Sequence, residues 1–267
     1  MALVPFPGPQ SGTYPIRPDD DDDDAPGAKM SFLEHLDELR KRIVNSLIAV
    51  GVGILISFTF IQKIYSFMMA PTMSQLPAGS RLIYTEPGEA FSLYIMLSMI
   101  IGTIIASPFI MYQVWMFIAP GLYSNEKRLA IPFVLFSTLG LVGGAVFNHY
   151  IMFPWMMHFF ASFNTQDLVF MPKLDSVFSL YTKFLIAMAA VFQMPTLVYF
   201  LAKMKVITAR FLVSQFKYAV LIIFIISAVI TPTGDPVTQT VFAAPMVGLY
   251  LLGIIIAWVV GPKRLTE

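Results

Sequence analysis

Six long apolar segments constrain the fold of this chain more than any other feature. Each approaches the roughly 20 residues that a helix needs to cross a lipid bilayer. Only 12% of the 267 residues are charged and 57% are hydrophobic, whereas a soluble domain carries about 25% charged residues. The sequence therefore predicts an all-α polytopic membrane protein with six transmembrane helices. The segments are residues 43–61, 91–112, 129–150, 177–202, 211–230 and 241–260.

The basic residues beside these segments predict their orientation, because cytoplasmic flanks of membrane helices carry an excess of Lys and Arg. Of the 17 Lys and Arg residues, 13 lie on the side of the two termini. The other side has only Lys63, Arg81, Lys173 and Lys183. We therefore expect both termini to be cytoplasmic.

The two ends of the chain differ from the apolar middle. Residues 1–29 are rich in Pro, Gly and Asp and contain little that can be buried, so we interpret them as a disordered cytoplasmic tail. The run of aspartates at 19–24 is typical of a solvated linker, although its charge also suits a basic partner. Residues 30–262 form the predicted membrane domain, and residues 263–267 a short cytoplasmic tail.

The fifth segment is unusually short. Lys217 lies inside its nominal length, and the Pro-rich stretch 231–236 ends it, so that only residues 218–230 are free of charge. A span of this length thins the bilayer locally or makes the lysine extend toward the cytoplasm. We favour the second explanation for Lys217 and keep thinning as a hypothesis for the last two spans.

Prolines interrupt several of the predicted spans, and a proline removes a backbone donor and kinks a helix. Such kinks are tolerated in lipid where neighbouring helices satisfy the freed backbone groups. The pattern predicts a curved, fixed bundle. The prolines are Pro108, Pro132, Pro195 and Pro245.

The charged stretch 31–42 comes directly before the first span. Ser31 and Glu34 fit a capping box, which predicts that a helix begins there. Apolar residues at 32, 36, 39 and 43 form one stripe, with Glu38 and Arg40 pointing away from it. The simplest interpretation is an interfacial helix that orients the first span.

A second carboxylate, Glu126, faces the same compartment as Glu38 in this topology. It is a single acid among bases, so it is either an ion-pair partner of Lys127 or Arg128 or part of a binding site. Two separated carboxylates can each accept a guanidinium through charge-assisted hydrogen bonds.

Within the predicted spans, Gln193 is a deeply placed polar residue beside Pro195. A buried glutamine commonly joins neighbouring helices, and the alternative is a docking point for another membrane helix. His149 and His158 have no matching ligand set, the chain has no cysteine, and we expect no metal site or cofactor.

Taken together and in this order, these stretches resemble the TatC family, the multi-spanning subunit of the twin-arginine protein translocase. The resemblance covers about residues 30–262. The matching stretches are residues 35–42, 70–71, 75–77, 112–115, 117–120, 126–128, 153–154, 231–235, 239–240 and 244–246.

The resemblance implies a concave, glove-shaped bundle in the bacterial cytoplasmic (inner) membrane. It implies a receptor, rather than an enzyme, for signal peptides of folded precursor proteins that carry two adjacent arginines. The implied partners are TatA- and TatB-like single-span subunits and further copies of the chain, with transport driven by the proton-motive force. No cofactor or nucleic-acid partner is implied.

Residue roles carry over by position. Signal-peptide binding is implied for Glu38, Glu126, Arg40, Phe117 and Lys127. Contact with a partner helix is implied for Gln193 and Pro195, and structural or functional roles in loops for Pro71, Pro108 and Asp235. The chain departs from the family at Gln193, where many members carry a glutamate. A glutamine still forms hydrogen bonds but offers no titratable carboxylate.

Two other classes of function deserve comparison with this reading. An ion-coupled solute transporter usually shows ionisable residues inside the membrane and an internal repeat. Here Lys183 and Lys217 lie toward the ends of spans, and the two halves show no clear repeat. A membrane-embedded enzyme needs a nucleophile–base pair or a metal set, and the sequence indicates neither.

Overall fold

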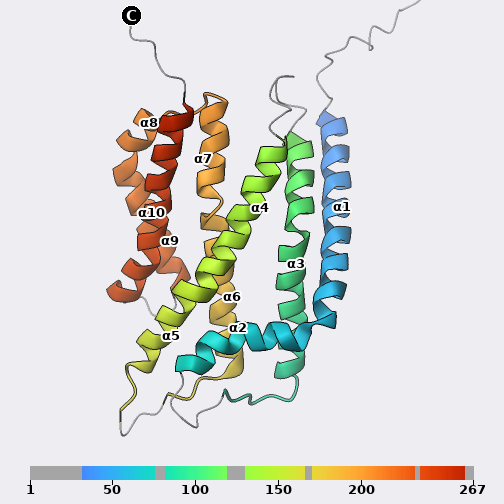
Figure 1. Cartoon of the computed structure of the whole chain (residues 1–267), viewed down its shortest axis with the longest axis vertical. Helices are drawn as coiled ribbons and strands as arrows, with labels where there is room; N and C mark the ends of the chain where they lie inside the picture. Colours follow the sequence, from blue (N-terminus) through green and yellow to red (C-terminus); the bar gives the residue numbers. More distant parts are fainter. Residues whose placement is uncertain (1–31, 76–81, 119–129, 166–169, 232–234, 262–267) are drawn as a thin grey trace, which may run out of the picture.

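The computed structural model describes residues 32–75, 82–118, 130–165, 170–231 and 235–261. Within these ranges the long helices run side by side, and α2 lies across one end of them (Figure 1). The start of α1 and the end of α10 lie at the same end of the molecule. The helices are α1 Phe32–Thr59, α2 Ile61–Gln75, α3 Glu89–Ile118, α4 Ala130–Phe147, the π-helix η3 Asn148–Met152, α5 Phe153–Ala161, α6 Leu174–Val191, α7 Met194–Lys203, α8 Ala209–Ser214, α9 Phe216–Ile230 and α10 Pro236–Val260.

The helices confirm the six apolar segments predicted from the sequence. Five helical stretches in the described part are long and apolar enough to cross a membrane. The sixth, α9, has only 15 residues, which at 1.5 Å per residue spans about 22 Å against a hydrocarbon core of about 30 Å. Figure 1 shows that α9 and α10 end short of the level of α2. The fifth span is therefore short, as the sequence predicted.

The prolines affect the spans unequally. The fourth span breaks between α6 and α7, and Pro195 lies in the first turn after this break. Pro108 and Pro245 instead lie inside helices that continue past them. Pro71 lies inside α2. The third span continues beyond its predicted end through the π-helical turn Asn148–Met152, which the sequence did not indicate.

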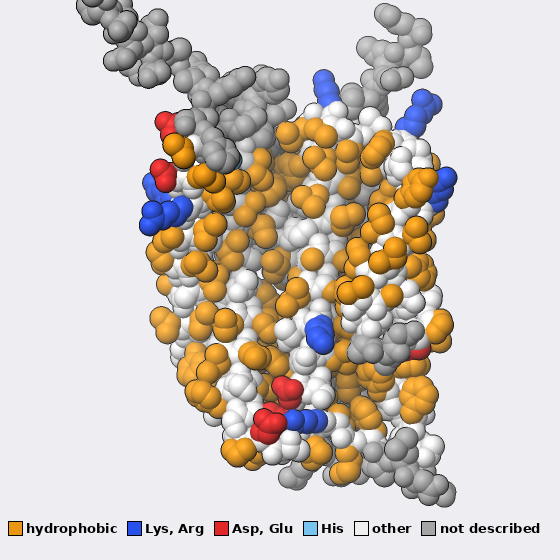
Figure 2. All heavy atoms as spheres, turned by 180° about the vertical axis from the view of Figure 1, so that it is seen from behind, with side chains coloured by type: hydrophobic (Ala, Val, Ile, Leu, Met, Phe, Trp, Pro, Cys, Tyr) orange, Lys and Arg blue, Asp and Glu red, His pale blue; other side chains and the backbone are white. Residues whose placement is uncertain are grey.

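The core lies where α2, α3, α5, α6 and α10 meet. Phe153, Phe184 and Phe242 are fully buried there, and the rings of Phe184 and Phe242 lie 5.0 Å apart. Most of the remaining surface is apolar, while charged side chains lie mostly at its two ends (Figure 2). This distribution suits a protein whose solvent along most of its length is lipid.

Helix α1 is joined to the rest of the molecule by close packing against α3. A Cβ atom at Gly53 would lie 2.3 Å from the carbonyl oxygen of Gly102, so only glycine permits this approach. Small residues serve the same purpose at other contacts between membrane helices. One turn farther along, the Ser57 hydroxyl donates to the carbonyl of Ser98 at 2.9 Å. These contacts set the antiparallel register that aligns the start of α1 with the end of α3.

Candidate functional site: a carboxylate between α1 and α3

The start of α1 and the end of α3 form a polar contact at the end of the molecule where the described chain begins. The ring of His35 stacks on Phe117, with centroids 4.4 Å apart. One turn toward the membrane, Arg42 on α1 donates from Nη1 to Oε1 of Gln113 on α3 at 3.2 Å. The site therefore joins two helices that are distant in sequence.

Glu38 lies beside Arg42 in this contact. Nη2 of Arg42 donates to Oε1 of Glu38 at 3.0 Å, and the two side chains are only 20% and 15% exposed. Arg42 therefore bridges a carboxylate on its own helix and an amide on α3. Charge-assisted hydrogen bonds of this kind are stronger than neutral ones.

One of the two carboxylate oxygens of Glu38 has no hydrogen-bond partner among the described residues. This oxygen, Oε2, is buried, and none of the described residues donates to it. Nε of Arg42 is likewise buried and has no acceptor among the described residues. A buried acceptor without a partner is unfavourable. The arrangement therefore leaves Glu38 with an open acceptor position for a further donor.

An apolar groove continues from this contact toward the middle of the membrane. It lies between α1 and α3, with a volume of about 220 Å³, and Arg42, Gln113 and Phe117 lie on its wall. Apart from Ser46, its other lining residues are apolar. The site thus combines a charged entrance with an apolar continuation.

Two residues of the apolar stripe predicted on the charged stretch, Leu36 and Ile43, are 44% and 50% exposed. The Glu38 side chain is only 15% exposed. Apolar side chains of a membrane helix can face lipid, whereas charged ones usually face the interior of the protein. The predicted cap residue Ser31 lies outside the described residues.

The predicted signal-peptide residues are only partly placed. The structure brings Glu38 and Phe117 into one site, and Arg40 is exposed on the same helix as Glu38. Glu126 and Lys127 lie outside the described residues. Sequence reasoning missed His35, Arg42 and Gln113 as members of the site. The spacing of Glu38 and Arg42 on one helix was a usable signal, whereas Gln113 has none in the local sequence.

Gln193 joins two helices of this chain. Its Nε2 donates to the carbonyl of Ser137 on α4 at 2.9 Å. Nearby, the Thr196 hydroxyl donates to the carbonyl of Phe136 at 3.3 Å. This contact supports the first of the two interpretations, in which Gln193 links neighbouring helices of the chain.

Asp235 caps the last helix. Its Oδ2 accepts the backbone N–H of Thr238 at 2.7 Å, which satisfies one of the free donors at the start of α10. Asp235, which was predicted to act in a loop, therefore has a local structural role as a helix cap.

A second buried carboxylate, Glu89, was not predicted. Its oxygens accept three backbone N–H groups, from Thr85 at 3.0 Å, Glu86 at 3.4 Å and Asp175 at 2.8 Å. Nζ of Lys173 lies 3.8 Å away. Glu89 thus ties the segment before α3 to the first turn of α6, at the end of the molecule opposite Glu38.

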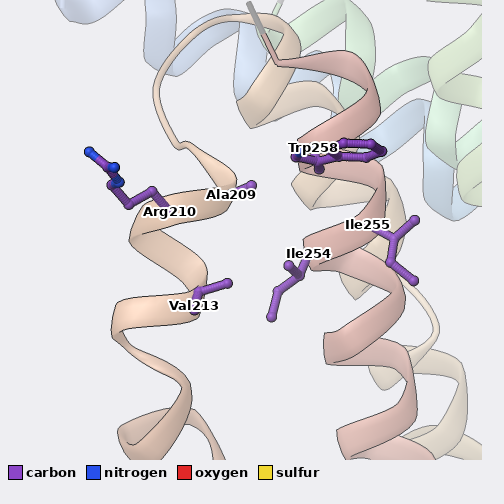
Figure 3. A pocket seen from close by; sticks show the side chains of 6 residues that line it. All are labelled: Ala209, Arg210, Val213, Ile254, Ile255 and Trp258. Carbon is purple, nitrogen blue, oxygen red and sulfur yellow. The ribbon is translucent and has the colours of Figure 1, made fainter. Parts of the chain in front are cut away.

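A different pocket, of about 450 Å³, lies between α8 and α10. Figure 3 shows Val213 and Ile254 on its facing walls, while Arg210 points away from it. Trp258 is 76% exposed at its edge. Its lining is apolar, so it lacks the carboxylate and amide that distinguish the Glu38 site.

The fold and the site define a multi-pass membrane protein with a partly buried carboxylate at one end of its helices. Residues 34–245 match the protein family described as Sec-independent protein translocase protein (TatC). The chain therefore belongs to the TatC family. It is a subunit of a protein translocase and not an enzyme, and this sets aside the solute-transporter alternative.

Similar proteins agree with this placement. The Sec-independent protein translocase protein TatC of Koribacter versatilis is 40% identical over 240 residues, covering 88% of each chain. The protein of the same name from Desulforapulum autotrophicum is 39% identical over 236 residues, covering 88% of this chain and 87% of the other. The crystal structure of a twin-arginine translocase receptor, TatC, superimposes with a TM-score of 0.73 at 38% identity, covering 84% of this chain and 98% of that one.

Proposed function

We propose that this protein is the signal-peptide receptor and core subunit of a twin-arginine translocase in the bacterial cytoplasmic membrane. In this proposal both termini face the cytoplasm, and the proton-motive force drives the export of folded precursors. The observation that carries the proposal is the open oxygen of Glu38 in a partly buried site at the end of α1 and α3.

The chemistry of the site favours arginine as its ligand. A guanidinium is planar, permanently charged and able to donate two parallel hydrogen bonds to one carboxylate. A lysine ammonium is a strongly hydrated point charge and lacks this fork. A partly buried carboxylate therefore selects arginine over lysine. We assign the first contact to Glu38, flanked by Phe117 and Arg40, and the second to Glu126 with Lys127.

The remaining roles extend the proposal to the complex. Gln193 and Pro195 lie where α6 gives way to α7, and we assign this break to contact with a TatA- or TatB-like helix. Pro71, Pro108 and Asp235 shape the elements around it. Further copies of the chain complete the assembly.

The experiment that tests the receptor role is photocrosslinking from a probe placed at position 39, in the wall of the groove next to Glu38, in the full-length chain in its complex. A twin-arginine signal peptide should crosslink, and a twin-lysine peptide should not. In parallel, the variant Glu38→Gln should lose binding of the unlabelled peptide. Asp37→Asn is the matched control, because Asp37 is exposed on the same helix. Equal binding by Glu38→Gln and the parent protein would contradict the receptor role of Glu38.

A further inference from the structure

We propose that Arg42 competes with the ligand for Glu38. It pairs with Glu38 in the resting protein and is exchanged for an arginine of the signal peptide. By this exchange Arg42 sets the requirement for a pair of arginines. The inference rests on the proposed receptor function of Glu38 and adds a specificity-determining residue to it.

The contacts of Arg42 are those expected of an internal competitor for Glu38. It presents to Glu38 the same guanidinium group that a signal-peptide arginine would present, at 3.0 Å from Oε1. Its other terminal nitrogen is held by Gln113 at 3.2 Å. The chain therefore already contains one arginine–carboxylate pair at the position where the ligand is proposed to bind.

The pair is incompletely formed. Arg42 contacts a single oxygen of Glu38, and both Oε2 of Glu38 and Nε of Arg42 stay buried without a partner among the described residues. A guanidinium arriving from outside the helix can present two parallel donors to the carboxylate. The geometry of an i,i+4 pair on one helix gives Arg42 only one such bond. The internal arginine is therefore a weaker partner than an unconstrained one.

Exchange at Glu38 explains why one arginine is insufficient. When a first ligand arginine displaces Arg42, one ion pair is broken and one is formed, so little affinity is gained. If Arg42 stays in place, the incoming cation meets a like charge on the same carboxylate, which is also unfavourable. In both cases the net gain must come from the second arginine at another acceptor. The Arg42–Glu38 pair thus keeps the affinity for a peptide with a single arginine low.

The guanidinium of Arg42 can reach water when the ligand displaces it. Its side chain is one-fifth exposed, and the long stem of an arginine can carry its charge to the aqueous boundary. This movement also breaks the hydrogen bond from Nη1 to Gln113, whose amide stays on α3 to receive the guanidinium again. The displaced guanidinium then remains close enough to return when the ligand leaves.

The test measures the affinity of the full-length chain, in its complex in lipid nanodiscs, for twin-arginine and arginine–lysine signal peptides. The variant Arg42→Met keeps an unbranched side chain and removes the charge. We expect it to bind the arginine–lysine peptide about tenfold more tightly than the parent does. Its affinity for the twin-arginine peptide should rise by a similar factor, because the first arginine displaces Arg42 in both complexes.

The control is Lys41→Met, which removes the same charge from an exposed neighbouring position. It should leave both affinities within about twofold, as expected for a screened surface charge. A second variant, Gln113→Leu, removes one hydrogen bond of Arg42 without removing its charge and should strengthen the binding of both peptides by a smaller factor. This variant decides the matter if Arg42→Met fails to fold.

The outcomes separate the two proposals. Weaker or unchanged binding of the arginine–lysine peptide by Arg42→Met, or by Gln113→Leu where the first does not fold, overturns the exchange while leaving the receptor function intact. A parent protein that binds neither peptide in an assembled complex overturns the receptor function, and the exchange with it.

Discussion

Two buried carboxylates at opposite ends of α3 differ in how they are satisfied. Glu89, at the start of α3, accepts three backbone N–H groups and has Lys173 nearby. Among the described residues Glu38, beside the far end of α3, has one side-chain partner, Arg42, and one buried oxygen without a partner. Backbone donors cannot leave without unfolding the segment, whereas an arginine side chain can rotate away. Glu89 is therefore a structural tie, and Glu38 is suited to exchange its partner.

The comparison teaches that burial alone does not identify a binding carboxylate. Both glutamates are largely withdrawn from solvent, with side-chain exposures of 5% for Glu89 and 15% for Glu38. The distinguishing observation is which hydrogen-bonding positions are filled, and by what kind of donor. Two variants test this distinction directly, and two smaller ones test other hydrogen bonds of the fold.

The largest effect is expected for Gly102→Ala, which should destroy the Glu38 site and spare the Glu89 tie. The new Cβ would lie 2.6 Å from the backbone nitrogen of Ile54, so α1 must move away from α3. We expect the free energy of unfolding to fall by about 3 kcal/mol. Peptide binding should be lost as Glu38 and Gln113 separate.

Gly51→Ala is the matched control for this variant. A Cβ at Gly51 has nothing within 4 Å, so the change should be neutral or slightly stabilising, as alanine is the better helix former. Thermal unfolding in nanodiscs measures both. Retained binding in a destabilised Gly102→Ala protein would show that the α1–α3 register does not build the site.

The second largest effect is expected for Glu89→Gln. The charge that strengthens three hydrogen bonds is removed, and one of the acceptor oxygens becomes a donor. We expect the thermal midpoint to fall, with peptide affinity unchanged in the folded protein. Glu86→Gln is the control, because Glu86 is 78% exposed and should contribute less than about 0.5 kcal/mol.

A smaller effect is expected at the helix cap. Asp235→Ala should lower the free energy of unfolding by about 1 kcal/mol, because the bond to the N–H of Thr238 is lost. Asp235→Ser retains a capping oxygen and should restore most of this loss. If serine is as harmful as alanine in an unfolding titration, Asp235 acts through its charge rather than as a cap.

The smallest effect is expected for the amide inside the membrane. Gln193→Met removes the hydrogen bond to the carbonyl of Ser137, and such bonds between membrane helices contribute about 0.6 kcal/mol on average. Gln62→Met, at an exposed position on α2, is the control for loss of an amide. A loss well above that of the control in complex assembly, with stability unchanged, would support the role of Gln193 in contacting a partner helix.

Much of the fold followed from hydropathy, because the requirement to cross a bilayer dictates long apolar helices. The six segments, the short α9 and the break beside Pro195 were all visible in this way. The π-helical turn Asn148–Met152 was not, since it depends on local packing rather than on composition. The exposure of Leu36 and Ile43 was not predicted, because an apolar side chain of a membrane helix can face either lipid or protein.

The site was less accessible from sequence than the fold. The partner of Glu38 lies four residues away. Gln113 lies 71 residues from Arg42 and is brought close by the packing of α1 against α3. Glu89 gave no sign of its role, because its shortest hydrogen bond comes from Asp175, 86 residues along the chain. Such contacts require the packed helices and are absent from any local pattern.

The most direct test of the account compares Glu38→Gln with Glu89→Gln in one experiment. Both the affinity for a twin-arginine peptide and the thermal midpoint are measured for the full-length protein in its complex. We predict that Glu38→Gln loses binding by about tenfold or more and keeps its midpoint, while Glu89→Gln keeps binding and loses stability. Undiminished binding by Glu38→Gln, or loss of both properties to the same extent in both variants, would contradict the division between an exchangeable and a structural carboxylate.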